Sequence, residues 1–268
     1  MKRWIYWALT LLLAAILAVS GVHIATTLLD YRSSAQSYRS AAETAGLPQS
    51  QPAPPADQSA PDSSEQPSFQ QTLAAIDLAA LQQVNPEVIG WIAIPDTELS
   101  YPLLQTSNNS YYLNHLWNKQ RNSGGSIYLE CQNAQDFSDF NTIIYGHRMR
   151  DDSMFGTLRH YADADFFQAH PSVYLADGNG VRQYDIFAAY EVGVREIVYR
   201  LDADQTKEEF IQFCLSHSAI QTGVEPTPED HVLTLSTCTE RGHATRWVVQ
   251  AVLRDQPDPG PAIGSTWS

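Results

Sequence analysis

The pattern of hydrophobic and polar positions divides the chain into three stretches. Residues 4–29 contain no Asp, Glu, Lys or Arg. Residues 33–68 are rich in Ser, Ala, Gln and Pro. From about residue 70, apolar residues recur at the spacings of helices and strands, which indicates a folded domain. The pattern therefore predicts an apolar helix, a linker and one globular domain.

The first stretch is long enough to cross a membrane as a helix. At a rise of ~1.5 Å per residue, residues 4–29 extend about 39 Å, whereas the hydrocarbon layer of a bilayer is about 30 Å thick. A cleaved signal peptide is the alternative, but its apolar region has only ~7–15 residues. Lys2 and Arg3 precede the stretch, and basic flanks stay in the cytoplasm. We therefore expect a single-pass membrane anchor, with residues 1–3 cytoplasmic and the remaining chain outside the cytoplasm.

Residues 30–69 are expected to form a disordered linker. They include the run PQSQPAPPADQSAPDSSEQPS. Such a sequence buries too little apolar surface to offset the entropy lost on ordering, and clustered prolines keep it extended. Residues 255–268 are also rich in Pro and Gly and are expected to form a flexible C-terminal tail.

Strand-like segments dominate residues 70–254, which are expected to form one domain. The segments are rich in β-branched and aromatic residues and are separated by Gly- and Asn-containing turns. They cover residues 88–94, 99–104, 126–130, 141–146, 172–176, 181–190, 231–237 and 245–254. About eight strands in one domain are typical of a β-barrel or a β-sandwich.

Helices are expected at four places in this domain. Apolar residues recur at helical spacing over residues 70–84, and shorter helical pieces are expected at 108–116 and 153–169. A fourth helix begins after Thr206, because Thr206 and Glu209 have the spacing of a capping box. This last helix precedes the seventh strand.

Composition and cysteine content restrict the function. The formal net charge of −14 argues against nucleic-acid binding, because phosphate recognition needs clustered Lys and Arg. The cysteines are Cys131, Cys214 and Cys238, which are too few for an exported domain held together by disulfides. At most one pair can form, so at least one thiol is free.

Cys238 is the candidate nucleophile among these cysteines. Side chains alternate between the two faces of a strand, so Cys238 lies on the face opposite Leu235, at the end of the strand. A free cysteine is most often a buried apolar residue, and Cys214 fits that description on the apolar face of its helix. Whether Cys131 is a structural or a reactive thiol is left open. A thiol at a strand end is held by the sheet yet accessible.

His147 and Arg246 are the candidate partners of this thiol. A cysteine nucleophile needs a nearby base or cation, and His147 follows directly after the fourth strand. His243, close to Cys238 in sequence, is the alternative. If the last two strands form a hairpin, Arg246 returns to Cys238, where a guanidinium can stabilise an oxyanion. Arg241 is the alternative cation.

These residues, in this order, resemble the sortases. The matching motifs are Tyr145-Gly146-His147, Leu235-Ser236-Thr237-Cys238 and Arg246. The resemblance covers about residues 85–254 and is similar to class B in particular, because of Gly125-Ser126-Ile127-Tyr128 and the helix before the cysteine strand. It implies an eight-stranded β-barrel and a catalytic domain at the surface of a Gram-positive cell, tethered by the anchor.

The resemblance also implies a mechanism and partners. Cys238 attacks the Thr carbonyl of a C-terminal sorting motif on another exported protein, similar to Asn-Pro-Gln-Thr-Asn and cut after Thr. Arg246 stabilises the oxyanion, and His147 protonates the leaving amine. The resulting thioester passes to an amine of a peptidoglycan precursor, such as lipid II. No cofactor is implied, because class B enzymes are not generally calcium-dependent.

Further residues are implied to contact the substrate peptide: Asn109, Leu113, Ser236 and Thr237. Glu240, two residues after the cysteine, is expected either to orient Arg246 and face the substrate or to be a solvated carboxylate. Residues 191–200 (EVGVREIVYR) match the corresponding substrate-binding region of the family poorly, which leaves the motif open.

Several alternatives remain at this point. A lysine of a pilin is an alternative acceptor, which would make the enzyme a pilus polymerase. L,D-Transpeptidases use similar chemistry, but they place an Arg about two residues after the Cys, where this chain has Glu240. Papain-like proteases have the Cys before the His, the reverse of this order. A non-catalytic surface barrel would keep Cys238 buried and unreactive.

Overall fold

The computed structural model describes residues 2–48, 68–201, 206–239 and 242–255, and the following bounds come from it. The α-helices are α1 (Lys2–Thr44), α2 (Phe69–Ala74), α3 (Leu78–Val84), α4 (Ala164–Ala169) and α5 (Lys207–His217). Three 3₁₀ helices are η1 (Tyr111–Leu113), η2 (Gly156–Ala162) and η3 (Ile197–Tyr199). The strands are β1 (Val88–Ala93), β2 (Ser100–Leu104), β3 (Ile127–Leu129), β4 (Asn141–Tyr145), β5 (Ser172–Asp177), β6 (Gly180–Gly193), β7 (Val232–Thr239) and β8 (Gly242–Asp255).

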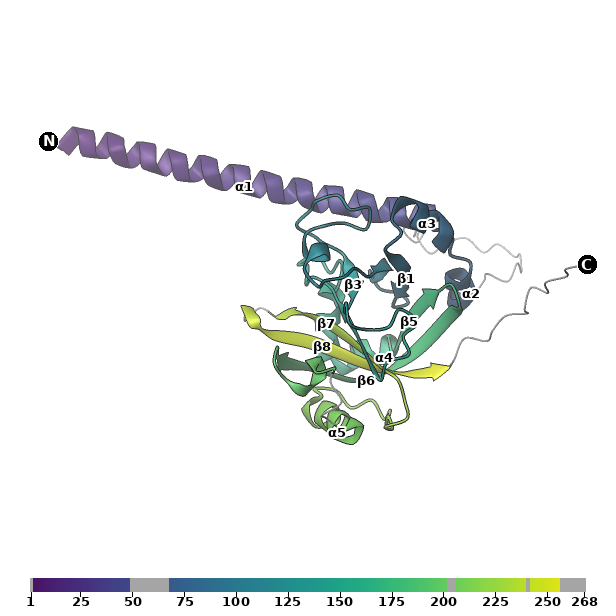
Figure 1. The fold of residues 1–268 in the computed structure, drawn as a ribbon. Coiled ribbons are helices and arrows are strands. Elements are labelled where there is room, and N and C mark those ends of the chain that lie inside the picture. The colour runs from purple at the N-terminus through teal and green to yellow at the C-terminus, as the bar shows by residue number, and fades with distance from the viewer. Residues whose placement is uncertain (1, 49–67, 202–205, 240–241, 256–268) are drawn as a thin grey trace, which may run out of the picture.

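The strands close into a barrel in the order β1-β2-β3-β4-β7-β8-β6-β5. This confirms the eight-stranded barrel and excludes a sandwich of two open sheets. The β2–β3 and β4–β7 pairs are parallel, and the other pairs are antiparallel. The parallel β4–β7 pair is formed by strands that are far apart in sequence. Figure 1 shows the two long strands β6 and β8 running side by side, with α5 below them.

Two hydrophobic clusters stabilise the barrel. The larger one includes Trp91, Leu233 and Leu235, and it extends to residues of α1. The smaller one lies outside the barrel, where Phe210 and Cys214 of α5 pack against β6 and β8. Burying one large apolar side chain contributes about 1.5–3 kcal/mol. The capping box that was predicted before α5 is present, because the Thr206 side chain accepts the Glu209 N–H and the Glu209 side chain reaches back.

Helix α1 continues well beyond the apolar stretch. Its apolar part is exposed, and by length and composition it is a candidate membrane span. The helix ends at Thr44, and the N–H groups of Gly46 and Leu47 then donate to the carbonyls of Glu43 and Ala42. Figure 1 shows the first part of α1 projecting away from the barrel and its last part lying against it.

The structure therefore differs from the expected linker over residues 30–44, which are helical. The buried positions recur on one face: Ser34, Ser37, Tyr38, Ala41 and Ala45. Four of these five residues are Ser or Ala, so they resemble a linker by composition even though their spacing is helical. Residues 49–67 of the expected linker and residues 256–268 of the expected tail lie outside the described residues.

The helix expected over residues 70–84 is interrupted in the structure. It forms two short helices, α2 and α3, because Asp77 lies between them and its side chain accepts the Ala80 N–H at 2.8 Å. Asp at this position favours a helix start over a helix interior. Both helices lie beside the barrel, close to the end of α1 (Figure 1).

Candidate active site

The barrel topology brings His147, Cys238 and Arg246 to the same end of three adjacent strands. In the parallel β4–β7 pair, Tyr145 lies opposite Ser236. His147 and Cys238 each come two residues after this last pair, His147 just beyond the end of β4 and Cys238 still within β7. In the antiparallel β7–β8 pair, Arg246 lies directly opposite Cys238. A hairpin between the last two strands is thus confirmed, and Cys238 lies on the strand between the other two candidates.

Hydrogen bonds maintain this register just before the candidate residues. The Gly146 N–H donates to the Ser236 carbonyl at 3.2 Å. The Thr237 hydroxyl donates to the Gly146 carbonyl at 2.7 Å. Both bonds link β4 to β7 immediately before His147 and Cys238. They fix the two backbones directly before the two candidate residues.

Two tyrosines report on the electrostatics around Cys238 and Arg246. Burial raises the pKa of Tyr199 to about 12, its hydrogen bond with Ser236 and the charge of Arg246 lower it, and Cys238 raises it. The pKa of Tyr128 is also raised, mainly by burial and then by Glu130. As for Tyr199, Arg246 lowers this pKa and Cys238 raises it. Cys238 and Arg246 therefore lie within electrostatic range of both tyrosines. Cys238 itself is partly exposed, as a nucleophile requires.

The side chain of His147 is held between η1 and a close turn. Its Nε2 lies 2.6 Å from the Leu113 carbonyl oxygen. On the same side is Gly125, with φ of 58°, where an added Cβ atom would lie 2.8 Å from Cδ2 of His147 and 2.6 Å from the Tyr112 carbonyl oxygen. Only glycine fits this backbone without strain, because both the left-handed φ and the close contacts oppose a side chain.

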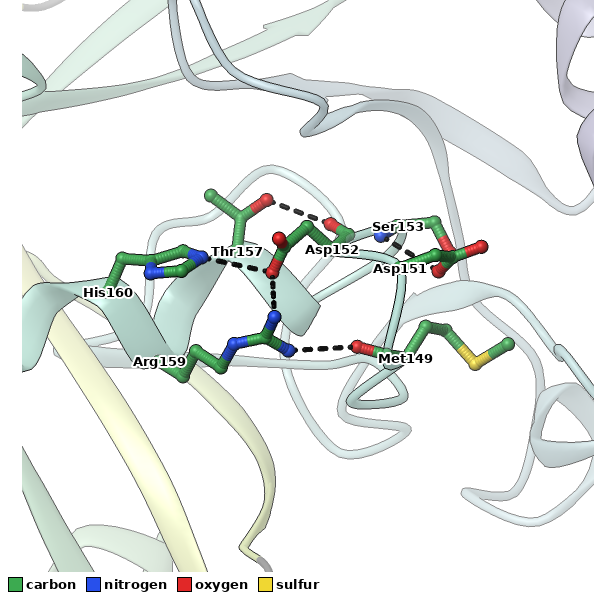
Figure 2. A network of polar contacts seen from close by, with 7 residues as sticks. All are labelled: Met149, Asp151, Asp152, Ser153, Thr157, Arg159 and His160. Carbon is green, nitrogen blue, oxygen red and sulfur yellow. Dashed lines mark hydrogen bonds and ion pairs between the residues drawn. The ribbon is translucent and has the colours of Figure 1, made fainter.

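The loop after His147 returns to its backbone and is fixed by charged groups. The Phe155 N–H donates to the His147 carbonyl at 3.0 Å. Figure 2 shows Arg159 and His160 converging on the Asp152 carboxylate, at 2.7 Å and 3.0 Å respectively. Arg159 also donates to the Met149 carbonyl at 3.3 Å. These contacts tie the loop after His147 to η2 and, through Phe155, to the backbone of His147.

The face of β7 that leads to Cys238 is polar, as expected, but it is buried. Ser236 Oγ lies 2.8 Å from Tyr199 Oη. Two residues earlier on the same face, the Thr234 hydroxyl donates to Asn141 Oδ1 at 2.7 Å and accepts from Gln250 at 3.1 Å. Buried polar groups of this kind are usually paired. Cys238 is therefore the partly exposed end of a row of hydrogen-bonded polar residues.

The expected substrate contacts are in different environments. Ser236 and Thr237 are 1% and 2% exposed, and both hydroxyls are hydrogen-bonded within the protein. Leu113 is 44% exposed, and its carbonyl contacts His147. Asn109 donates to Glu130 Oε2 at 2.6 Å and accepts the Cys131 N–H at 2.8 Å. Of the four, Leu113 offers its side chain most directly to a ligand.

Sequence reasoning missed Glu130 as part of this region. Its buried carboxylate accepts hydrogen bonds from Asn109 and from the Tyr145 hydroxyl, the latter at 3.0 Å. It thus connects the loop before η1 to the residue two positions before His147. A Glu directly after an apolar strand was the signal in the sequence, but a solvated strand end gives the same pattern.

The other cysteines differ from Cys238, and all three are free thiols. Cys214 is fully buried, and burial raises its pKa to about 12. Burial and a hydrogen bond to Glu130 raise the pKa of Cys131. Glu240 and Arg241 lie outside the described residues, as does the side chain of His243. Within the described residues, no group of three or more His, Cys, Asp or Glu is placed to hold a metal ion.

Comparison with known proteins agrees with this geometry. A family model described as the sortase domain matches residues 92–254. Sortase B of Listeria monocytogenes is 38% identical over 181 residues, which cover 66% of this chain and 74% of that protein. Sortase B of Staphylococcus aureus is 32% identical over 163 residues, which cover 60% of this chain and 67% of that protein.

The solved structures give the same result. A Staphylococcus aureus sortase B–substrate complex matches with a TM-score of 0.62 at 30% identity, covering 66% of this chain and 84% of that one. The family match removes the L,D-transpeptidase and non-catalytic barrel alternatives. Family model, identity and barrel topology agree, and the chain therefore belongs to the sortase family, as a cysteine transpeptidase of class B.

Proposed function

We propose that Cys238 is the nucleophile, His147 the proton donor and acceptor, and Arg246 the oxyanion-stabilising residue of this enzyme. The observation that supports this most is the strand register: Arg246 lies opposite Cys238, and Tyr145 and Ser236, each two residues before His147 and Cys238, lie opposite one another. Adjacent strands are about 4.8 Å apart, which lets long side chains from neighbouring strands meet at one substrate carbonyl.

In the first step, the Cys238 thiol passes its proton to His147, and the sulfur attacks the Thr carbonyl carbon of the substrate. The C–N bond of the scissile peptide breaks, and the leaving nitrogen takes a proton from His147. In the second step, an incoming amine gives a proton to His147 and attacks the thioester, which releases Cys238. Arg246 donates hydrogen bonds to the oxyanion in both steps, and its charge does not depend on pH in the working range.

The contact with Leu113 supports a proposal for which nitrogen of His147 exchanges the proton. A carbonyl oxygen only accepts hydrogen bonds, so Nε2 of His147 is the donor in the 2.6 Å contact. Nδ1 is then the nitrogen that is free to accept a proton in the neutral ring. We assign acid–base exchange to Nδ1, and the Leu113 carbonyl to the stabilisation of this tautomer.

The substrate is proposed to be an exported protein with a sorting motif similar to Asn-Pro-Gln-Thr-Asn, cut after Thr. The acceptor is proposed to be a peptidoglycan amine, such as that of lipid II. Solved structures of sortase B include one in complex with substrate and one in complex with triglycine, a peptide with a free amine. These support a peptide donor and an amine acceptor for this chain. A pilin lysine is the alternative acceptor.

The proposed substrate contacts follow from exposure and position. Leu113 packs against the peptide with its exposed side chain. Asn109 flanks the peptide. Glu240 lies outside the described residues and is kept as a proposed contact from the sequence alone. Ser236 and Thr237 contact it only through main-chain atoms, because their hydroxyls are used within the protein.

We also propose that residues 4–29 anchor the enzyme in the cell membrane. The N-terminus is then cytoplasmic and the catalytic domain extracellular, where exported substrates and wall precursors meet. The apolar part of α1 supports this by its length and exposure.

The test uses the full chain in detergent with a fluorogenic peptide that contains Asn-Pro-Gln-Thr-Asn. Cys238→Ala should abolish cleavage, whereas the matched control Cys131→Ala should retain it. Mass spectrometry of the wild-type enzyme mixed with peptide should find the acyl group on Cys238. If Cys238→Ala cleaves at the wild-type rate, or if the acyl group is found on another residue, the assignment is wrong.

A further inference from the structure

The C-terminal third of α1 contacts the barrel along its length. We call residues 30–45 the docking segment. Its first residue, Asp30, accepts hydrogen bonds from Asn122 at 3.0 Å through its carbonyl and from Ser123 at 2.8 Å through its carboxylate. At its end, the Ala45 carbonyl accepts the Asp77 N–H at 3.0 Å. The segment thus belongs to the folded domain.

Tyr38 lies at the centre of the docking segment and reaches the loop next to His147. Tyr38 is buried, and its hydroxyl donates to the Gly125 carbonyl at 2.6 Å. Ser126 Oγ lies 2.9 Å from the same hydroxyl. Gly125 is the residue that lies too close to Cδ2 of His147 to carry a side chain. Tyr38 therefore holds the backbone of Gly125, which lies directly beside the His147 ring.

A second set of contacts leads from Tyr38 to the backbone of His147. The rings of Tyr38 and Tyr101 meet edge to face, with centroids 5.0 Å apart. The Tyr101 hydroxyl accepts the Met154 N–H at 3.1 Å. The next residue, Phe155, donates its N–H to the His147 carbonyl at 3.0 Å. Tyr38 is thus connected to both the ring side and the main-chain side of His147.

We propose that Tyr38 is a positioning residue for His147, acting through Gly125 on one side and Tyr101 on the other. The docking segment then serves catalysis as well as attachment, because α1 is continuous from the apolar stretch to Tyr38. This rests on the proposed role of His147 as the proton donor and acceptor. Misplacement of a catalytic group by about 1 Å slows a reaction by about 100-fold, so a smaller displacement has a measurable effect.

The test compares Tyr38→Phe with Tyr31→Phe in the full chain, in detergent. Tyr31 lies two helical turns earlier and is partly buried, and its hydroxyl has no hydrogen bond among the described residues. Tyr38→Phe keeps the ring and removes the hydroxyl with its hydrogen bonds, which include those to Gly125 and Ser126 and one with the Trp117 backbone. We expect it to lower kcat about threefold to tenfold with KM within about twofold, and to shift the pH profile of kcat/KM. Tyr31→Phe should change neither.

A spectroscopic measurement separates positioning from general stability. Histidines labelled with ¹³C at Cε1 give one resonance each, and His147→Gln identifies that of His147. Tyr38→Phe should move this resonance and its titration midpoint, while Tyr31→Phe should not. If the resonance and the pH profile do not move, or if both variants move them equally, the proposal is overturned, even when Tyr38→Phe lowers the melting temperature. Because this readout does not need turnover, it is independent of the result for Cys238→Ala.

Discussion

Gly125→Ala tests whether the close turn at Gly125 stabilises the domain and keeps His147 in place. An added Cβ atom would lie 2.6 Å from the Tyr112 carbonyl oxygen, 2.8 Å from that of Leu113, and 2.8 Å from Cδ2 of His147. Two of these three atoms are backbone atoms, which cannot rotate away. The variant is therefore expected to move the backbone of η1, the ring of His147, or both.

The magnitude follows from two separate contributions. A left-handed φ costs a non-glycine residue roughly 1–2 kcal/mol. Forcing an extra methyl group into a packed site costs about 1–3 kcal/mol more. For a domain of this size, 1 kcal/mol lowers the melting temperature by about 2–4 °C. Gly125→Ala should therefore lower the melting temperature by about 4–20 °C.

Gly223→Ala is the matched control. Gly223 also has a left-handed φ, of 73°, but no atom lies within 4 Å of its added Cβ. It carries the backbone cost alone, so a loss of only about 2–8 °C is expected. The gain from a stiffer unfolded chain is common to both variants and cancels in the comparison. The difference between the two variants therefore measures the contacts around His147.

The assays are thermal unfolding by circular dichroism and cleavage of the fluorogenic peptide at a temperature where both variants are folded. Gly125→Ala should lose most of its activity, because His147 is displaced, and Gly223→Ala should keep wild-type activity. Equal melting temperatures for the two variants would refute the steric argument. A fully active Gly125→Ala enzyme would refute the link between this turn and His147.

Two further predictions use thiol chemistry and truncation. At pH 8 a thiol-specific reagent should modify Cys238 faster than Cys131 and leave Cys214 unmodified until the protein unfolds. The reason for Cys214 is that a pKa of about 12 leaves only about 10⁻⁴ of its thiol as thiolate. Mass spectrometry of the native protein checks the order of modification, and early modification of Cys214 would contradict it. A chain that begins at residue 48 should unfold at least ~4 °C below one that begins at residue 30, because it loses the buried Tyr38 and the hydrogen bonds of the docking segment, together more than about 2 kcal/mol. Equal stability in calorimetry would show that the segment does not stabilise the domain.

The strands could be predicted from the sequence because their signal is local. Each segment of β-branched and aromatic residues lies between turn residues, and each appears in the structure within a few residues of its expected limits. The candidate site could be predicted in part for a related reason. Cys238 and Arg246 belong to one hairpin, so their pairing follows from two neighbouring strands. His147 required the non-local β4–β7 pairing, which only the family resemblance supplied.

The docking segment could not be predicted, because its composition is typical of a linker whereas its structure is a helix packed on the domain. Ser and Ala give little apolar signal, and Pro-rich sequence follows shortly afterwards. Small side chains are nevertheless what allows a helix to lie close to a barrel, and their spacing matches one helical face. A pattern based on the position of small residues would have found it, whereas one based on hydrophobicity did not.

The docked helix has a consequence for how the enzyme reaches its substrate. A disordered linker would let the domain rotate freely above the membrane, and substrate capture would depend on chance orientation. Asp30 follows directly after the apolar stretch, and it already contacts Asn122 and Ser123 of the barrel. If residues 4–29 cross the membrane, the catalytic domain is held close to its surface, with the loop at residues 122–124 toward the lipid. The helix then fixes the orientation of Cys238 relative to the membrane.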